Sequence, residues 1–371
     1  MGLSLKYIFH KKEKAVLFFE PGGIGDYMFC RPFFKFIHQS ERFKNLKKVY
    51  IVKDNFAEFM NAYDSQYFDE IISYSTSDFE NDRYYRKYLF NKLNRYKYEQ
   101  IVNLRTVVVD NLKDYNPRKR IIRTLKSSKK TVNAIYVKNN DRRLNQMYNN
   151  VIFSDKKYDF ELERKRKFFE ELLGIKIGDD YSFKIEPILN TSNNIAISMF
   201  ATTERRMLSF EKWKQIIHKM AELYPDRNFV FLGSQGEKKD INKFVQSLNC
   251  KDRCKNLAGT PLSIIPDVLR QCELLLSVES GNVHLAQSVG CKTICFSNGS
   301  YYQRFHPYPD SENVKYIYSE QFLNNLNNNK IDLWDTYGGN QDWAVDGIYL
   351  TDIISSINSF LDVEVSNNGK N

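Results

Sequence analysis

The sequence predicts an α/β protein with two domains, each built around a parallel sheet. Short apolar runs alternate with longer amphipathic stretches, which is typical of strands connected by helices. The alternation begins with the strand-like run Lys14–Glu20 (KAVLFFE) and restarts in the second half at Ile195–Phe200. At 371 residues the chain is long enough for two domains of ordinary size. We place these domains at residues 1–180 and 190–345, followed by a C-terminal helix at 346–362 and a tail at 363–371.

Further elements of the first half follow from the spacing of apolar residues. The predicted strands are Lys48–Val52, Glu70–Tyr74 and Gln100–Leu104, and the predicted helices are Tyr27–Gln39, Asp82–Tyr96 and Phe160–Leu173. Pro32 falls near the first turn of its helix, where proline is tolerated. Pro117–Lys130 is strongly basic and weakly patterned, and the polar run Asn139–Asn150 predicts a loop. We interpret Gly174–Ser192 as the linker to the second domain.

The second half shows the same alternation. The predicted strands are Phe229–Leu232, Leu274–Leu276 and Thr293–Phe296, and the predicted helices are Phe210–Leu223, Lys238–Leu248, Leu262–Arg270, Leu285–Val289 and Ile348–Leu361. Pro225 ends the first of these helices, because proline cannot continue the backbone hydrogen bonds. The asparagine-rich run Asn324–Asn329 predicts a surface loop, and Ser366–Asn371 predicts a frayed tail.

The composition argues against several classes of protein. No apolar run approaches the roughly 20 residues that span a bilayer. Met1–Lys14 lacks the apolar core and the cleavage site of a secretory signal. The cysteines are Cys30, Cys250, Cys254, Cys272, Cys291 and Cys295. They are sparse and lie mostly in or beside predicted strands, so we expect reduced core thiols in a cytoplasmic protein and no zinc site.

The positive charge lies in the first half. The net charge is +10; residues 1–180 contain 36 Lys and Arg against 24 Asp and Glu, whereas residues 181–371 contain 19 against 21. Two segments concentrate it, Arg83–Lys97, where tyrosines are interleaved, and Arg118–Lys130. Aromatic residues mixed with basic residues suit the headgroup layer of an anionic membrane. The alternatives are a solvated helix face whose tyrosines pack inward, and a nucleic-acid surface, for which no recognisable motif is present.

One stretch, Ser277–Ala286 (SVESGNVHLA), stands between a buried strand and a helix. Ligands of open α/β sheets bind at the carboxyl ends of strands, near helix N-termini. The candidate binding residues are therefore Glu279, Ser280 and Gly281. The carboxylate can accept hydrogen bonds from sugar hydroxyls, and the glycine lets backbone amides approach a ligand. His284 either contacts phosphate or packs behind the loop. The alternative interpretation is a capped helix start with a buried histidine. The other four histidines have no motif around them and receive no role.

This motif, an acid followed by Ser-Gly-x-x-His-Leu-Ala, resembles glycosyltransferase family 9, the lipopolysaccharide heptosyltransferases. Three further segments agree in order and spacing with this family: the Gly-Asp turn Gly22–Asp26, the donor-domain segment Ala201–Arg206 and the turn Asn256–Thr260. The resemblance covers most of the second half and little of the first. Glu279 stands where the family usually has Asp, and Met207–Leu208 where it usually has Trp-Pro.

The resemblance implies a GT-B fold, with two Rossmann-like parallel-sheet domains facing a central cleft. It also implies an inverting transfer of heptose from ADP-heptose to a bacterial lipopolysaccharide or lipooligosaccharide core acceptor. The partners are then a nucleotide sugar, a glycolipid and an anionic membrane surface, with no cofactor and no specific nucleic acid. We expect a cytoplasmic protein, peripheral at the cytoplasmic face of the inner membrane. The alternatives are a GT-B enzyme for another nucleotide sugar, a basic nucleic-acid-binding protein, and an inactive glycan-binding relative, against which an intact Asp26 argues.

Two acids have both a local and a functional interpretation. Asp26 closes the glycine turn that contains Gly23 and Gly25, which we also assign to the donor site. Local sequence favours Asp26 as a helix N-cap, whereas the resemblance implies that it is the catalytic base. The resemblance puts Glu237 near the nucleotide ribose, and the alternative is an acid of a first helical turn favoured by the helix dipole.

The diphosphate candidates are Thr202, Thr203, Arg205 and Arg206. Hydroxyl, backbone amide and guanidinium groups donate hydrogen bonds to phosphate without a metal. The resemblance implies that a Lys or Arg at this place holds the phosphates, and the choice between Arg205 and Arg206 stays open. Asp-x-Asp occurs nowhere in the chain, so we expect no metal site and a metal-independent reaction.

Overall fold

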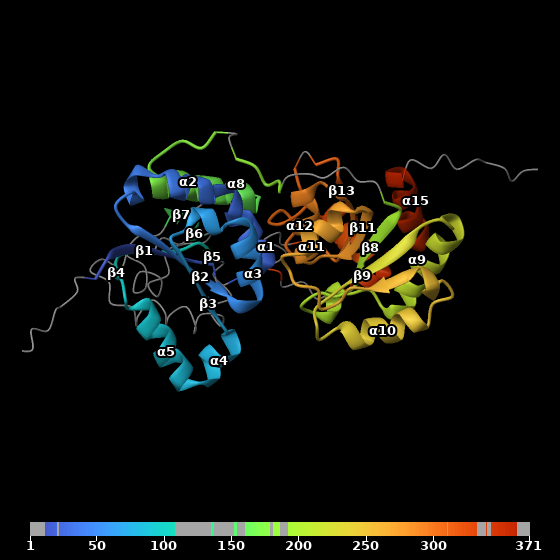
Figure 1. The fold of residues 1–371 in the computed structure, drawn as a ribbon. Coiled ribbons are helices and arrows are strands. Elements are labelled where there is room, and N and C mark those ends of the chain that lie inside the picture. The colour runs from blue at the N-terminus through green and yellow to red at the C-terminus, as the bar shows by residue number, and fades with distance from the viewer. Residues whose placement is uncertain are drawn as a thin grey trace, which may run out of the picture. The chain divides into compact units, whose positions relative to one another are not determined.

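The computed structural model describes residues 12–20, 22–107, 135–136, 152–153, 160–178, 181–185, 192–309, 311–331, 339 and 343–361. The chain divides into two compact units (Figure 1). Unit 1 comprises Met1–Gly22, Phe33–Asp155 and Arg166–Ile177. Unit 2 comprises Gly23–Pro32, Lys156–Lys165 and Gly178–Asn371, so two short segments from the first half of the sequence pack with the second half.

Unit 1 is built around a four-stranded parallel sheet in the order β3-β2-β1-β4. Its strands are β1 (Lys14–Phe19), β2 (Lys47–Lys53), β3 (Glu70–Tyr74) and β4 (Lys97–Asn103). All four predicted strands of the first half are therefore confirmed. Three very short strands, β5 (Thr106–Val107), β6 (Ile135–Tyr136) and β7 (Ile152–Phe153), form a separate parallel sheet.

Helices cover both faces of the larger sheet of unit 1. They are α2 (Phe34–Gln39), α3 (Asp54–Tyr63), α4 (Thr76–Asn81), α5 (Arg83–Leu93) and the unit 1 part of α8 (Glu161–Leu173). In Figure 1, α2 and α8 lie on one side of the sheet and α4 and α5 on the other. Phe79 and Leu89 of the α4–α5 pair are buried with Leu17 and Ile51 of the strands. This core fixes which face of α5 points to solvent.

Unit 2 is built around a six-stranded parallel sheet in the order β10-β9-β8-β11-β12-β13. Its strands are β8 (Asn194–Ser198), β9 (Asn228–Leu232), β10 (Cys254–Asn256), β11 (Cys272–Val278), β12 (Lys292–Ser297) and β13 (Val314–Tyr318). The chain builds from β8 to β10 and then continues on the other side of β8 with β11. The strand order thus reverses between β8 and β11, which is where open α/β sheets bind ligands.

The helices of unit 2 are α1 (Ile24–Cys30), α9 (Phe210–Leu223), α10 (Lys238–Gln246), α11 (Ile265–Arg270), α12 (Gly281–Val289), α13 (Glu320–Asn327) and α15 (Leu350–Leu361). Side chains alternate along the strands, and Ile195 and Ile197 of β8 face a core with Trp213, Phe244 and Ile357 of α9, α10 and α15. Helix α12 contacts β11, β12, α11 and α1. The predicted α/β fold with two parallel sheets is confirmed.

Three predicted helix starts are wrong: α11 begins three residues later than predicted, at Ile265 instead of Leu262, and two others begin earlier because their caps lie earlier in the sequence. Helix α1 begins at Ile24 instead of Tyr27, and a 3₁₀ turn at Arg31–Phe33 separates it from α2. Pro32 within this turn has no backbone N–H to continue the α-helical bonds. Helix α12 begins at Gly281 instead of Leu285, because Ser280 is already in the extended N-cap conformation.

The predicted surface loop at Asn324–Asn329 is wrong over most of its length, because these asparagines end helix α13. Ser319 caps this helix by accepting a hydrogen bond from Phe322 N (3.4 Å), and Phe322 is fully buried. The cap and the buried ring offset the weak helix propensity of asparagine. The sequence analysis also did not predict β10, β13, α3 and α4.

Some predictions concern residues outside the described ranges. They are the basic segment Pro117–Lys130, the loop Asn139–Asn150 and the tail Ser366–Asn371. Across the described ranges, no helix is at once long and apolar enough to cross a membrane. The six cysteines are free thiols, and all except Cys254 are buried.

Arg253 closes the C-terminal end of α9. Its guanidinium donates hydrogen bonds to the backbone carbonyls of Ala221 (2.9 Å), Tyr224 (3.0 Å), Pro225 (2.8 Å) and Arg227 (3.0 Å). The last carbonyls of a helix have no intrahelical donor, so Arg253 satisfies those of Ala221 and of the C-cap residue Tyr224. Its bonds to Pro225 and Arg227 fix the loop that follows the helix.

We predict that Arg253→Gln lowers the free energy of unfolding by about 1.5–3 kcal/mol, the usual contribution of hydrogen bonds to a charged group. The matched control is Lys219→Gln on the same helix, which removes an exposed ion pair with Glu222 (3.0 Å). Such pairs contribute at most about 1 kcal/mol. Urea unfolding followed by circular dichroism measures both variants, and equal losses would contradict the capping role of Arg253.

Candidate active site

Polar residues from two segments meet at the carboxyl ends of β8 and β11. Arg206 follows β8, and its Nη1 lies 3.7 Å from Oε1 of Glu279, which follows β11. Asn282 Nδ2 in the first turn of α12 donates to Ser198 Oγ at the end of β8 (2.9 Å). The structure therefore brings two of the predicted segments together at the point where the strand order reverses.

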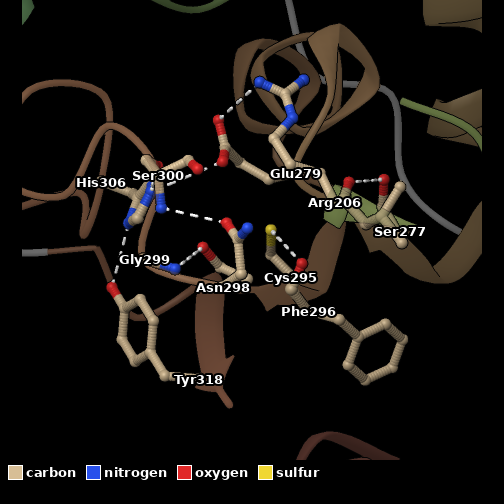
Figure 2. A network of polar contacts seen from close by, with 12 residues as sticks. Arg206, Ser277, Glu279, Cys295, Phe296, Asn298, Gly299, Ser300, His306 and Tyr318 are labelled. Carbon is tan, nitrogen blue, oxygen red and sulfur yellow. Dashed lines mark hydrogen bonds and ion pairs between the residues drawn. The ribbon is translucent and has the colours of Figure 1, made fainter. Parts of the chain in front are cut away.

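Glu279 lies between Arg206 and His306 (Figure 2). Its Oε2 is 3.8 Å from His306 Nε2, and the residue is 7% exposed. Burial raises the pKa of the Glu279 carboxyl to about 7, although Arg206 acts in the opposite direction. Because both protonation forms are then present near neutral pH, this carboxyl can either accept or donate a hydrogen bond to a ligand hydroxyl.

His306 is a part of the site that the sequence analysis missed. Its Nε2 donates to the carbonyl of Ser300 (2.6 Å), and its Nδ1 accepts from the hydroxyl of Tyr318 (3.0 Å) (Figure 2). Burial lowers the pKa of His306 to about 4, so the ring is neutral at pH 7. The ring also stacks on Tyr316, with 5.0 Å between centroids. No local motif surrounds His306, so the sequence carried no signal for it.

Asn298 joins two loops of the site. Its Oδ1 accepts from Ser300 N (3.1 Å), and its Nδ2 donates to the carbonyls of Arg205 (3.4 Å) and Trp343 (2.6 Å). One buried amide thus ties the turn after β12 to the loop after β8. The sequence analysis gave Asn298 no role, although a polar residue directly after a buried strand is a signal that could have found it.

The two arginines after β8 have different surroundings. Arg206 pairs with Glu279, and its guanidinium lies over the ring of Tyr301 at 5.5 Å. Arg205 is exposed, as are Thr202 and Thr203. The structure therefore holds Arg206 against the protein, whereas a ligand can reach Arg205 and the two threonines from solvent.

The N-terminus of α12 points to the same end of the sheet. Ser280 is its N-cap residue, but the side chain makes no capping bond, and its Oγ lies 3.2 Å from Ser277 Oγ. The first amides of a helix have no intrahelical acceptor and carry partial positive charge. The turn at Ser280 and Gly281 therefore has the chemistry of an anion site.

Asp26 lies in the first turn of α1 and belongs to unit 2. Its Oδ2 accepts from Gly23 N (3.0 Å), so it caps the helix from the third helical position instead of the predicted N-cap position. Its Oδ1 lies 3.7 Å from Arg304 Nη2, and its side chain is 13% exposed. The carboxylate thus has a local capping role and a nearby cation at once.

Two glycines allow α1 to approach α12. A Cβ at Gly281 would lie 1.9 Å from Ile24 Cγ2, and a Cβ at Gly25 would lie 2.9 Å from His284 Cδ2. A side chain at either position would require Ile24 or His284 to shift or the helices to move apart. A Cβ at Gly23 would meet nothing within 4 Å. The close approach of α1 to α12 therefore depends on Gly25 and Gly281 and not on Gly23.

His284 packs behind the glycine turn, which is one of its two predicted roles. Its ring lies 4.9 Å from that of Phe29 and 6.0 Å from that of Phe305, and its Nδ1 is 2.7 Å from the Tyr308 hydroxyl. Burial lowers the pKa of His284 to about 3, and His306 adds to this effect. A neutral ring of this kind supports the packing of α1 on α12.

Glu237 immediately precedes α10 and closes the turn after β9. Its Oε2 accepts from Ser234 N (2.6 Å), and a Cβ at Gly233 would lie only 3.0 Å from this oxygen. Within the described ranges, its other oxygen, Oε1, has no hydrogen-bond partner. The structure thus shows the local role of Glu237 and leaves one oxygen for a ligand.

The groups at this end of the sheet include donors for an anion and acceptors for hydroxyl groups. In the part of the chain that the structure describes, no three His, Cys, Asp or Glu side chains are grouped to hold a metal. Exposed hydroxyls, a guanidinium and a helix N-terminus can instead bind an anion, and two carboxyls can bind hydroxyls.

Three solved structures with a similar fold are glycosyltransferases. A family 9 glycosyl transferase from Veillonella parvula is 14% identical, with 95% of this chain and 98% of that chain covered and a TM-score of 0.67. The E. coli heptosyltransferase WaaC, with ADP-2-deoxy-2-fluoro heptose, is 14% identical, with 92% and 99% covered and a TM-score of 0.64. E. coli ADP-heptose lps heptosyltransferase II is 14% identical, with 94% and 98% covered and a TM-score of 0.59. These similarities confirm the predicted GT-B fold class.

The family follows from the sequence match. No curated protein matches this sequence. The model of glycosyltransferase family 9 (heptosyltransferase), however, matches residues 140–331, just over half of the chain. The matched region contains the segments after β8, β9 and β11 that form most of the site. The chain belongs to glycosyltransferase family 9, the heptosyltransferase family.

Proposed function

We propose that this glycosyltransferase inverts the configuration at the sugar and transfers heptose from ADP-heptose to the core of a bacterial lipopolysaccharide or lipooligosaccharide. The family supports sugar transfer, and two similar structures are E. coli heptosyltransferases, one of them with ADP-2-deoxy-2-fluoro heptose. The observation that carries the proposal is the place of Asp26: a carboxylate in the same unit as the strand ends that offer anion-binding groups.

Asp26 acts as the general base in this mechanism. It takes the proton of the acceptor hydroxyl while the hydroxyl oxygen attacks the anomeric carbon of the donor. The bond between that carbon and the donor phosphate breaks in the same step, and the nucleoside diphosphate leaves with the bonding electrons. A single displacement of this kind inverts the anomeric configuration.

The donor lies along the ends of β8, β9 and β11. Thr202, Thr203, Arg205 and the N-terminus of α12 bind the diphosphate and stabilise the charge that develops on it. Glu279, which pairs with Arg206 and lies beside the neutral ring of His306, hydrogen-bonds a sugar hydroxyl, and Oε1 of Glu237 binds the ribose. Because these groups supply the positive charge, the reaction needs no metal ion.

Helix α5 docks the protein on the anionic cytoplasmic face of the inner membrane, where a glycolipid acceptor lies. Tyr84 and Tyr88, one turn apart, are 70% and 62% exposed, whereas Leu89 is buried in the core. Arg83 and Lys87 are exposed beside them, and the Arg83 guanidinium lies 5.1 Å from the centroid of the Tyr84 ring. Exposed tyrosines and cations together suit the headgroup layer.

We predict that Asp26→Asn lowers kcat by roughly 10²-fold or more, the scale of general-base catalysis, without loss of nucleotide binding. Asparagine keeps an oxygen that can accept from Gly23 N, so the helix cap survives. The control is Asp54→Asn, the same change in the first turn of α3 in unit 1. A near-normal rate for Asp26→Asn in a donor-consumption assay would exclude this residue as the base.

Donor choice is tested by thermal shift with ADP-, UDP- and GDP-sugars in excess EDTA. Ligand binding stabilises the folded state by about 2.7 kcal/mol at 100 times its Kd, so the preferred nucleotide gives the largest rise in Tm. We predict the largest rise for ADP-heptose and a smaller one in Arg205→Gln. A larger rise with a UDP- or GDP-sugar would indicate another donor.

Metal independence is tested in the donor-consumption assay with excess EDTA, where we predict that activity persists. Activity only with added Mg²⁺ or Mn²⁺ would contradict this prediction.

Membrane docking is tested by co-sedimentation with liposomes of anionic or neutral lipid. We predict binding to anionic vesicles that high salt removes, since each basic residue near such a surface contributes about 1 kcal/mol. Tyr84→Ser combined with Tyr88→Ser should weaken it, whereas Tyr349→Ser, at an exposed tyrosine of unit 2, should not. Equal sedimentation with anionic and neutral vesicles, or no sedimentation with either, would contradict membrane docking. The partner of the basic half would then be a soluble acceptor or a nucleic acid.

A further inference from the structure

We propose that Arg304, anchored by Glu161, is the positioning residue that holds Asp26 in its reactive orientation. The inference rests on the proposed role of Asp26 as the base. Neither Arg304 nor Glu161 belongs to a motif of the sequence, and 143 positions separate them. All three residues lie in unit 2.

Arg304 places one guanidinium between two carboxylates. Its Nε donates to Glu161 Oε2 (3.1 Å), and its Nη2 lies 3.7 Å from Asp26 Oδ1. The Arg304 side chain is only 7% exposed, so its charge is largely removed from water. A planar guanidinium with donors on different edges can hold two acids in fixed relative positions, which a lysine cannot do.

Glu161 is itself held on several sides. Its side chain is fully buried, its Oε1 lies 3.4 Å from Lys165 Nζ, and its backbone N donates to the carbonyl of Arg304 (2.8 Å). Glu161 and Arg304 are therefore joined through both backbone and side chain. This double contact fixes the direction of the guanidinium toward Asp26.

The loop that carries Arg304 is also constrained. The backbone φ angles of Tyr301 and Gln303 are positive, 64° and 63°, a conformation that residues other than glycine rarely adopt. Arg304 N donates to the carbonyl of Tyr301 (3.0 Å), and its guanidinium lies 4.5 Å from the centroid of the Phe305 ring. Strained backbone of this kind persists only where the surroundings hold it, and it is enriched at functional sites.

The consequence concerns the reaction itself. A general base must stay ionised and point at the acceptor proton, and a misplacement of about 1 Å can lower a rate by roughly 10²-fold. Gly23 N contacts one oxygen of Asp26, and Arg304 faces the other. Arg304 thus limits the rotation of the carboxylate and balances its charge, while the proton transfer remains with Asp26.

The test compares steady-state kinetics of Arg304→Gln, Arg304→Lys and Glu161→Gln in the full-length protein. We expect Arg304→Gln to lower kcat about 10- to 100-fold with donor KM and the nucleotide-induced rise in Tm unchanged, because the donor contacts are elsewhere. Arg304→Lys should have a higher kcat than Arg304→Gln, because lysine keeps the positive charge although it lacks the planar arrangement of donors. Adding Glu161→Gln to Arg304→Gln should lower kcat by no more than about twofold further, since the two residues act as one unit.

The control is Arg166→Gln on α8, which breaks a partly buried pair with Glu170 (2.9 Å) inside unit 1 and should leave kcat unchanged. A normal kcat in Arg304→Gln would overturn the proposal, and so would a fall in kcat accompanied by loss of the nucleotide-induced shift, which indicates a purely structural role. Asp26→Asn is measured in parallel. If Asp26→Asn stays active, the proposed base is wrong, whereas an inactive Asp26→Asn with a normal Arg304→Gln refutes the positioning role alone.

Discussion

The close packing of the first turns of α1 and α12 is the constraint on which the site depends. Gly25 and Gly281 have no Cβ, and added carbons at these positions would meet His284 and Ile24 at 2.9 and 1.9 Å. Because α1 comes from the first half of the sequence but belongs to unit 2, this packing brings Asp26 to the unit that contains β8 and β11. The position of Asp26 therefore depends on the absence of a Cβ at Gly25 of α1 and at Gly281 of α12.

Burial of charge explains the side chains around this contact. Glu279 is flanked by Arg206 and His306, and Asp26 faces Arg304, which Glu161 holds in turn. A charge removed from water is costly unless an opposite charge or hydrogen bonds compensate it. Arg206 provides the opposite charge for Glu279 and Arg304 provides it for Asp26, whereas the His306 ring is neutral at pH 7. The two acids also differ in their surroundings. Burial raises the pKa of Glu279 to about 7 although Arg206 acts in the opposite direction, and Asp26 caps the start of α1 beside Arg304.

Much of the fold could be predicted, because buried strands are visible as local apolar runs. Lys14–Glu20 and Thr293–Phe296 correspond to β1 and β12 within two residues. Helix boundaries were less predictable, because caps and burial decide them. Helix α12 starts at Gly281 because Ser280 is extended, and α13 forms because Phe322 is buried, although its C-terminal half is rich in asparagine. The family resemblance drawn from four short motifs is confirmed by the match over residues 140–331.

The sequence by itself determined which segments carry the chemistry. The Gly-Asp turn, the Thr-Thr-x-Arg-Arg segment and the Glu-Ser-Gly motif each follow a predicted strand, and the hydrophobic period alone places them at carboxyl ends. Only the tertiary structure decided the partners: that Arg206 and not Arg205 pairs with Glu279, and that Arg304 and Glu161 accompany Asp26. The physical reason is that strand ends follow from the local apolar pattern, whereas ion pairs depend on packing between segments far apart in the chain.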